Sequence, residues 1–239
     1  MGLVKEKYGN FLFEGKCVNG EISGKGKISD EEKKIILFEG DFFQGKIWNR
    51  KIFNLKGNII CELIKGKGLI KEYNKNNILK YEGEFLNGEL NGIFKTFNYK
   101  GQPSFEGEYI NGKRNGKGKE YFEGNLIFEG EYLYDHKIKG KEYVNGKIEF
   151  EGEYLYDKKW NGKGYDEYGN IIYELNNGNG KVREYLNDGS IQFDGEYLNG
   201  KKNGKCKEYI LIQRFCRILF ENEYSNGKII NSVKKLIQL

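Results

Sequence analysis

The sequence repeats one five-residue motif along almost its whole length: an aromatic residue, an acidic residue, glycine, any residue and a second aromatic. Clear copies begin at Phe38, Tyr81, Phe105, Phe128, Phe150 and Phe193; weaker copies begin at Phe13 and Phe220, and shortened units at Cys61 and Tyr173. These ten starts are spaced by about 23 residues on average, within the range of periods typical of tandem structural repeats. Such a period indicates modules that stabilise their neighbours.

Each unit carries the signals of a β-hairpin. In "LIFEGEYL", Phe128 and Tyr132 fall on one face of a strand and Glu129 and Glu131 on the other. Asn-Gly, the strongest short hairpin signal, follows at residues 87–88, 111–112 and 199–200. A second run such as "GKGKEY" returns the chain. We therefore expect an all-β fold with two short antiparallel strands in each unit.

The glycine between the two aromatics needs a reason, because glycine weakens a strand. We expect it to leave a gap in which a ring from a neighbouring unit lies on the backbone, so that the aromatics form one spine. The glutamates of the other face can pair with Lys117 and Lys119 and their counterparts. The register of the second strand stays open, because Tyr121 and Gly118 share a face only if a bulge separates them.

A longer repeat is superimposed on the short one. The segment "WNRKIFNLKGNIICELIKGKG" from Trp48 matches "WNGKGYDEYGNIIYELNNGNG" from Trp160 at a constant offset of 112 in the numbering. The array therefore resembles a duplicated block of about five units. Each tryptophan is expected to cover the gap left by the shortened unit that follows it; a platform on which a ligand stacks is the alternative.

The order of aromatics and glycines resembles the MORN (membrane occupation and recognition nexus) repeat. The matching residues are Phe105, Gly107, Tyr109, Gly112, Gly116 and Gly118, and again Phe193, Gly195, Tyr197, Gly200 and Gly204, with Cys206 in the last place. The segments "LYDHKIKG" and "LYDKKWNG" depart from the pattern, since they lack the Asn-Gly turn. The resemblance implies an elongated, twisted, single antiparallel sheet of about ten hairpins that tethers other proteins or touches phospholipid.

The resemblance covers residues 11–229, which leaves residues 1–10 as a lead-in and residues 230–239 as a tail or cap. The apolar residues of the tail lie near helical spacing, which predicts a short capping helix: Ile229, Ile230, Val233, Leu236 and Ile237. The apolar insertion "YILIQRFCRILFENEY" from Tyr209 to Tyr224 either packs under this helix or forms a self-association surface, which would give a homodimer through the C-terminal region.

Charge limits the classes of partner. The formal net charge is +5, because 40 basic residues are interleaved with 35 acidic ones, so nucleic-acid binding is not expected. Two lysine-rich hairpins leave an anionic membrane surface as an alternative partner: Lys113, Arg114, Lys117 and Lys119, and Lys201, Lys202, Lys205 and Lys207. The sequence shows neither a signal peptide nor a membrane-spanning run, which predicts a cytoplasmic protein, with a position at the periphery of a membrane or the cytoskeleton as an alternative.

No catalytic, cofactor-binding or metal-binding residue is predicted. The cysteines at 17, 61, 206 and 216 lack CxxC spacing, and the single histidine, His136, is expected in a solvated turn. The glutamates recur identically from unit to unit, unlike a catalytic pair, whose environments differ. The sequence therefore predicts a non-enzymatic scaffold or adaptor that binds a protein partner, with a peripheral membrane adaptor as the alternative.

Overall fold

The computed structural model describes residues 2–18, 21–43, 46–53, 59–74, 76–186, 188–213 and 216–238. These residues form 21 strands and no helix. The strands make three antiparallel sheets of six, ten and five strands, each in sequential order. The all-β hairpin fold is confirmed, whereas the prediction of a single sheet was wrong. By compactness the chain divides into residues 1–114 and 115–239, and each unit is described by itself.

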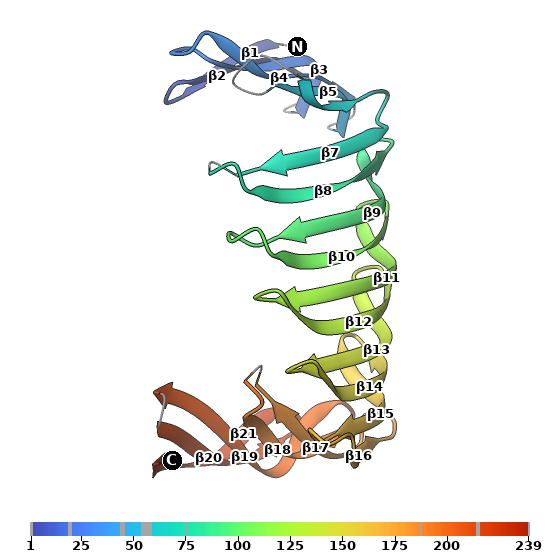
Figure 1. Ribbon diagram of the computed structural model, residues 1–239, viewed down its shortest axis with the longest axis vertical. Helices are drawn as coiled ribbons and strands as arrows, with labels where there is room; N and C mark the ends of the chain where they lie inside the picture. The colour runs from blue at the N-terminus through green and yellow to red at the C-terminus, as the bar shows by residue number, and fades with distance from the viewer. Residues whose placement is uncertain are drawn as a thin grey trace. The chain divides into compact units, whose positions relative to one another are not determined.

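The first unit holds the six-stranded sheet and the first four strands of the ten-stranded sheet (Figure 1). The six are β1 (Gly2–Tyr8), β2 (Phe11–Val18), β3 (Glu21–Asp30), β4 (Ile35–Phe43), β5 (Lys46–Phe53) and β6 (Ile59–Leu63); the four are β7 (Gly68–Tyr73), β8 (Leu79–Leu86), β9 (Glu89–Phe97) and β10 (Pro103–Ile110). The lead-in is itself a strand, because β1 pairs with β2 along its whole length.

The second unit holds the other six strands of the ten-stranded sheet and the five-stranded sheet. The six are β11 (Lys113–Phe122), β12 (Asn125–Leu133), β13 (His136–Val144), β14 (Lys147–Leu155), β15 (Lys158–Tyr165) and β16 (Ile171–Leu175). The five are β17 (Gly180–Tyr185), β18 (Ile191–Leu198), β19 (Lys201–Gln213), β20 (Cys216–Ser225) and β21 (Lys228–Gln238).

The hairpin turns follow the predicted chemistry. Asn111 and Gly112 both have positive φ, at 50° and 77°, as a two-residue type I′ turn requires. The divergent unit keeps this geometry without the usual residues, since Tyr134 and Asp135 have φ of 49° and 74°. A tyrosine in this region of φ is uncommon and unfavourable, because its Cβ crowds the backbone.

A bulge sets the register that the sequence left open. Gly118 is opposite Gly130 and Glu120 is opposite Phe128, but the register then shifts, so that Tyr121 is opposite Leu126. The same shift recurs between β13 and β14 and between β17 and β18. A bulge at this point of the second strand thus changes the alternation of faces between Gly118 and Tyr121.

The aromatic spine is present; at Gly130 and Gly140 the ring comes from the same hairpin, whereas Gly164 is met by the ring of Tyr173 from the following unit, as expected. A Cβ on Gly130 or Gly140 would lie 2.7 or 2.5 Å from Cζ of Phe128, so this ring covers the glycines of both strands. Phe128 is 1% exposed. Tyr154 of the next unit meets the Phe128 ring edge-on at 5.7 Å between centroids, which links consecutive hairpins.

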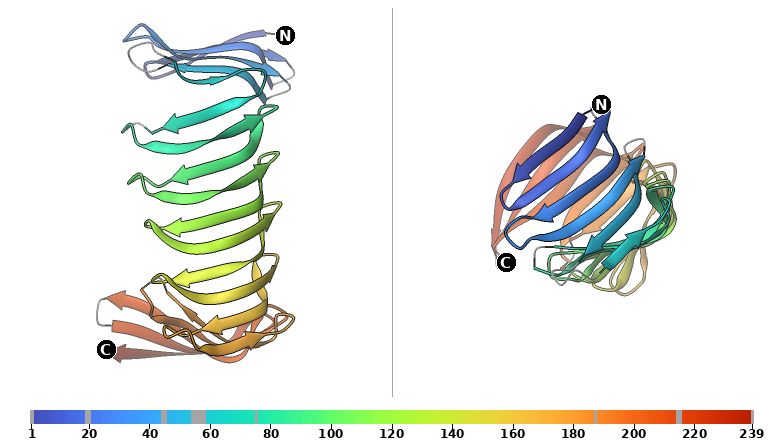
Figure 2. Two further views of the ribbon diagram at one scale, coloured as in Figure 1. Left: turned by 45° about the vertical axis from the view of Figure 1, so that its right-hand side comes forward. Right: turned by 90° about the horizontal axis from the view of Figure 1, so that it is seen from above.

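The sheets end at the two shortened units. Their hairpins close with the isolated bridges Ile64 to Lys67 and Asn176 to Asn179, which are equivalent positions in the two copies of the duplicated block. Within each unit the sheet after the short hairpin is turned relative to the sheet before it (Figure 2). These two corners are why the repeats do not form one continuous sheet.

Each tryptophan contacts the short hairpin that follows it. The Gly66 N–H donates to the Trp48 carbonyl at 2.5 Å, and the Gly178 N–H donates to the Trp160 carbonyl at 2.7 Å. A Cβ on Gly178 would lie 2.7 Å from Cζ3 of Trp160, so the indole covers this turn as expected.

The expected C-terminal helix is wrong, because residues 228–238 form the strand β21. Its pairing with β20 runs from Ser225 opposite Lys228 to Cys216 opposite Gln238. Pairing satisfies the backbone edge of β20, and β-branched residues such as Ile229 and Val233 favour strands. Packing of the apolar insertion under a helix is therefore excluded; the side chains of residues 211–218 lie outside the described part, and self-association through them stays untested.

Candidate functional site

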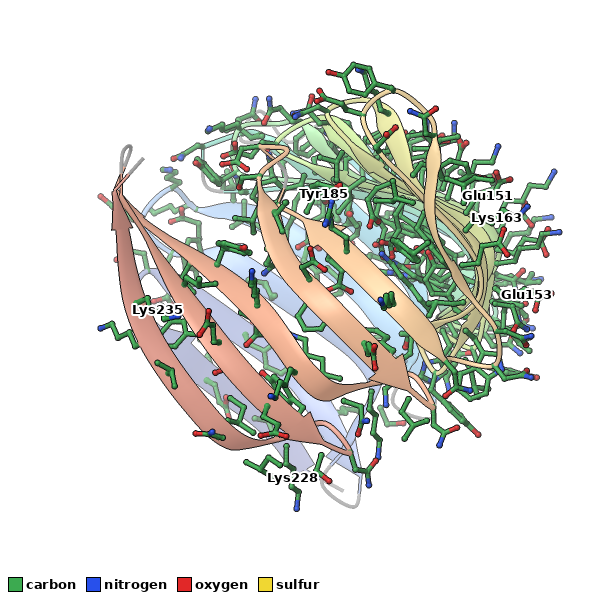
Figure 3. The ribbon with its side chains drawn as sticks, turned by 90° about the horizontal axis from the view of Figure 1, so that it is seen from below. Glu151, Glu153, Lys163, Tyr185, Lys228 and Lys235 are labelled. Atoms are coloured by element: carbon green, nitrogen blue, oxygen red, sulfur yellow. The ribbon has the colours of Figure 1, made fainter. Side chains whose placement is uncertain are left out.

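Each sheet has an inner face, on which the phenylalanine rings lie, and an outer face, on which most of the exposed Lys and Glu lie. In the second unit, Glu151, Glu153 and Lys163 point away from the five-stranded sheet, whereas Tyr185 lies between the two sheets (Figure 3). The two faces therefore offer different chemistry.

On the inner face a basic side chain lies over the phenylalanine ring of its unit. The ammonium of Lys137 is 4.0 Å from the ring centroid of Phe128, and Lys202 is 4.4 Å from that of Phe193. The guanidinium of Arg114 lies 4.2 Å from the ring centroid of Phe105. Such cation–π contacts stabilise most when they are removed from water. The basic residue just after the hairpin turn is therefore used for packing.

In the second unit a glutamate from two strands away or from the same strand neutralises Lys137, Lys202 and also Lys159, which lies over the Phe150 ring. Lys137 Nζ lies 2.9 Å from Glu120 Oε2, and Lys159 Nζ lies 3.0 Å from Glu142 Oε2. Lys202 forms an ion pair with Glu208. The inner face thus repeats a unit of ring, cation and carboxylate.

In β13–β15, near the corner, the arrangement of ring, cation and carboxylate gains further polar residues and forms a buried cluster. We call Glu142, Glu149, Lys159 and Tyr173 the corner cluster. Lys159 Nζ is 2.8 Å from Glu149 Oε2, and the residues Glu149 and Lys159 are 5% and 8% exposed. The Tyr173 hydroxyl donates to Glu149 Oε1 at 3.3 Å. A cavity of about 420 Å³ borders the cluster, lined also by Glu184 and Tyr197.

The pKa values of the Glu149 and Glu142 carboxyls are shifted in opposite directions. Burial raises the pKa of Glu149 to about 7, against the attraction of Lys159 and with the repulsion of Glu142. Burial also disfavours the charge on Glu142, but the Lys159 ammonium holds the pKa of that carboxyl below its ordinary value. Both carboxylates raise the pKa of Lys159 well above its ordinary value despite its burial.

The corner of the first unit combines an apolar core with an ion pair between Arg50 and Glu72, whose Nη2 and Oε2 atoms are 3.6 Å apart. Its core consists of Cys61, Leu63 and Ile70, all at most 5% exposed, with Ile52 packed against them. In the second copy of the duplicated block, Tyr173 stands at the position of Cys61 and Gly164 at that of Ile52.

The ring of Tyr173 compensates for the missing side chain at Gly164, since a Cβ there would lie 1.9 Å from Tyr173 Cε1. The larger ring also brings its hydroxyl to Glu149. Sequence reasoning missed the corner cluster; the signal was that Glu149 and Lys159 stand where the first block has Leu37 and Ile47.

The outer face bears an open groove over the glycines. In the second unit Gly118, Gly130, Gly140 and Gly152 form its floor, and its volume is about 340 Å³. Its walls are two rows of charged side chains: Lys117, Glu131, Lys139 and Glu153 in the first row, and Lys119, Glu129, Lys141 and Glu151 in the second. Similar grooves cross β2–β6 in the first unit and β17–β21 in the second.

The predicted lysine groups are mostly opposite glutamates. Lys119 Nζ lies 3.6 Å from Glu129 Oε2, and Lys207 is opposite Glu221. Lys202 lies on the inner face over the rings of Phe193 and Tyr224. The lysines therefore do not gather into one basic surface.

His136 joins two turns, which the sequence did not predict. Its Nδ1 lies 2.6 Å from Asp157 Oδ2, and the Lys137 N–H donates to the other oxygen of Asp157 at 2.7 Å. Its ring meets Tyr156 edge-on. The divergent turns at 134–135 and 156–157 are thus connected through side chains, although His136 stays about half exposed.

Cys61 and Cys206 are free and buried. Among the described residues no group of three or more His, Cys, Asp or Glu side chains is arranged to hold a metal ion. The same residues include no helix with the length and hydropathy needed to cross a membrane.

Comparison with known families adds one finding to this geometry. Residues 81–93, 105–125 and 193–210 match the MORN repeat model. The chain carries MORN repeats. The matched segments span β8 into β9, β10 to the start of β12, and β18 into β19, and each contains a hairpin with an Asn-Gly turn. MORN repeats are a non-catalytic family generally associated with protein–protein or membrane-lipid interactions. No curated protein gives a significant match to the chain.

Proposed function

We propose that this protein is a non-enzymatic scaffold that binds another protein along the outer face of its MORN repeats. The observation that carries the proposal is the glycine-floored groove between two rows of charged side chains. An exposed, regular surface of this kind suits an extended partner, because backbone without side chains permits close approach. A Cβ at Gly130 or Gly140 would point to the Phe128 ring of the inner face, so the floor of the groove on the outer face is backbone.

The inner face supports the proposal because its charged residues are engaged in packing and ion pairs within the protein. The basic residues after the turns are held by rings and glutamates, and in the corner cluster Lys159 lies between both carboxylates. A carboxyl whose pKa burial shifts to about 7 is a feature of many active sites, but structural ion-pair networks produce it as well. The recurrence of ring, cation and carboxylate from unit to unit favours the structural role.

An anionic membrane is the other partner to be considered. Against it, Lys119 and Lys207 are opposite glutamates, so a surface charge of one sign does not develop over the groove. Attraction to anionic lipid grows with the number of unneutralised basic residues near the surface.

The groove can be tested by reversing one wall without losing its cross-strand pairs. In the variant Lys117→Glu, Glu131→Lys, Lys139→Glu, Glu153→Lys, opposite charges still face each other at the three contacts between these strands. A photo-crosslinking amino acid at Glu151, on the other wall, should give discrete protein adducts in the native cell, and reversal of the first wall should abolish them.

A crosslinker at Tyr185, on the inner side, serves as the matched control and should give none of these adducts. Adducts that survive the reversal, or that form only at Tyr185, would contradict the proposal. Co-sedimentation with anionic vesicles that is lost in high salt would instead establish the membrane as the partner.

A further inference from the structure

On the outer face of β7–β10 in the first unit, one of the two rows of side chains differs from the corresponding row of β11–β14. In β11–β14 the first row alternates lysine and glutamate: Lys117, Glu131, Lys139 and Glu153. In β7–β10 the corresponding residues are Leu69, Glu84, Ile93 and Glu108, so that an aliphatic residue replaces each lysine. Leu69 is 52% exposed and Ile93 is 44% exposed.

The duplicated block shows that folding does not require these aliphatic residues. Leu69 is opposite Glu84 in the β7–β8 pair, and at the equivalent positions of the second copy Lys181 is opposite Glu196 in the β17–β18 pair. Ile93 likewise corresponds to Lys205. The same strand positions thus carry lysine in the second copy, which makes the exposed aliphatic residues a property of the first copy alone.

Two further exposed aliphatic side chains lie on the strands that pair with β7 and β9. Leu86 and Ile110 end β8 and β10 and are 43% and 48% exposed. Hydrogen bonds hold the hairpin turns in line, since the Gly88 N–H donates to the Gly66 carbonyl at 3.0 Å and the Gly112 N–H donates to the Leu90 carbonyl at 2.9 Å. We call Leu69, Leu86, Ile93 and Ile110 the aliphatic patch. Contiguous exposed apolar surface on a folded domain marks interaction sites.

The charge beside the patch indicates what it binds. Glu84 is exposed, and the described residues offer it neither an ion pair nor a hydrogen bond. The second row of the same strands keeps its partners, with Lys71 2.7 Å from Glu82 and Lys95 2.8 Å from Glu106. Because Leu69 and Ile93 stand where other units have lysine, the acidic residues of this row keep no lysine within it. The result is an apolar surface with net negative charge, which is complementary to a basic amphipathic segment.

We propose that the aliphatic patch and Glu84 form a docking site for a protein segment in which aliphatic and basic side chains share one face. Its aliphatic side chains cover Leu69 and Ile93, and its Lys or Arg pairs with Glu84. This inference rests on the proposed function of the chain as a protein-binding scaffold and names the partner chemistry for one part of its outer face.

The test uses the full chain and a fluorescent peptide, (Lys-Lys-Leu-Leu)₃, which presents both side-chain types on one face, with (Glu-Glu-Leu-Leu)₃ as the control. Fluorescence anisotropy should show binding of the basic peptide alone. The variant Leu69→Lys, Ile93→Lys, which has the residues of the second copy, should bind about tenfold or more weakly, with an unchanged melting curve. The reciprocal variant Lys181→Leu, Lys205→Ile should gain binding.

Equal binding of the basic peptide to wild type and to Leu69→Lys, Ile93→Lys, or equal binding of the acidic peptide, would overturn the inference. A wild-type dimer that becomes a monomer in this variant on analytical ultracentrifugation would also overturn it, because a second copy would then be the occupant. If protein adducts still form at Glu151 in either case, the scaffold function stands without this docking site.

Discussion

Lys159 Nζ lies 2.8 Å from Glu149 Oε2, and each of the two side chains is less than a tenth exposed. The same ammonium lies 3.0 Å from Glu142 Oε2 and 4.9 Å from the ring centroid of Phe150. One cation thus compensates two carboxyls and covers a ring at the corner of the second unit. Its removal should therefore affect both the charge balance and the packing of this corner.

Replacement of Lys159 by Met should lower the free energy of unfolding by about 3 to 5 kcal/mol at pH 8, because it leaves buried carboxylates without a partner. The loss should shrink as the pH falls, since protonation of Glu149 removes the uncompensated charge. Urea unfolding at several pH values measures both effects. Lys139→Met, at an exposed position in the wall of the outer groove, is the control and should change stability little.

The pKa of Glu149 predicts a pH dependence of its own. Its pKa in the folded state is raised to about 7, so the folded protein binds more protons than the unfolded chain between about pH 4.5 and 7. The stability contributed by this group is therefore full below pH 4.5 and is lost as the pH rises to 7. The difference in unfolding free energy between wild type and Glu149→Gln should decrease across this range and be constant above it.

A difference that stays flat from pH 4.5 to 7 would show that Glu149 is not buried beside Lys159 as described. Glu142→Gln is the matched control, because the pKa of Glu142 is lowered and its contribution is lost only as the pH falls through that lower value.

Replacement of Gly130 by Ala should destabilise the second unit by about 1 to 3 kcal/mol through overpacking. The added Cβ would lie 2.2 Å from the Lys139 carbonyl oxygen and 2.7 Å from the Phe128 ring. Gly146→Ala isolates the cost of positive φ alone, since φ is 75° and nothing lies within 4 Å of the added Cβ. Thermal unfolding should rank Gly130→Ala as the more damaging; the reverse order would argue against the close packing of the Lys139 carbonyl and the Phe128 ring around Gly130.

The two corner turns should respond alike, because they are copies. A Cβ on Gly66 would lie 2.7 Å from the Gly88 nitrogen, and one on Gly178 would lie 2.4 Å from the Gly200 nitrogen, with φ near 70° in both. Each Gly→Ala change should cost about 2 to 4 kcal/mol from backbone strain and collision together. Gly169→Ala, with open space around its Cβ, is the control. Hydrogen exchange can localise the loss to the affected unit.

The hairpins and their turns were predictable because the signals are local. Asn111 and Gly112 specify a turn by their tolerance of positive φ, and the spacing of Phe128 and Tyr132 specifies the buried face. The tail was mispredicted because apolar residues at Ile229, Ile230 and Val233 fit a helix and a strand equally well. Pairing with β20, which the turn at Asn226 and Gly227 joins directly to the tail, decides between them.

The sheet breaks and the corner cluster depend on relationships that one repeat does not contain. In the sequence, the shortened unit at Tyr173 looks like a repeat that has lost residues. Only the structure shows that β16 ends one sheet and β17 begins the next. Glu149 resembles any other glutamate of the array until it is compared with Leu37, its counterpart in the first block. The burial of Glu149 and its pairing with Lys159 depend on residues of other strands, so the sequence of one repeat does not predict them.

The side-chain contacts that join the turns at 134–135 and 156–157 limit where repeat units can be inserted or lost. The Asp157 carboxylate contacts His136 Nδ1 and accepts a hydrogen bond from the Lys137 N–H. One side chain therefore joins these two hairpins in addition to their strand pairing. A unit inserted between these two hairpins would separate Asp157 from both of its partners. The hairpins with turns at 134–135 and 156–157 are therefore expected to be gained or lost together, as a double module.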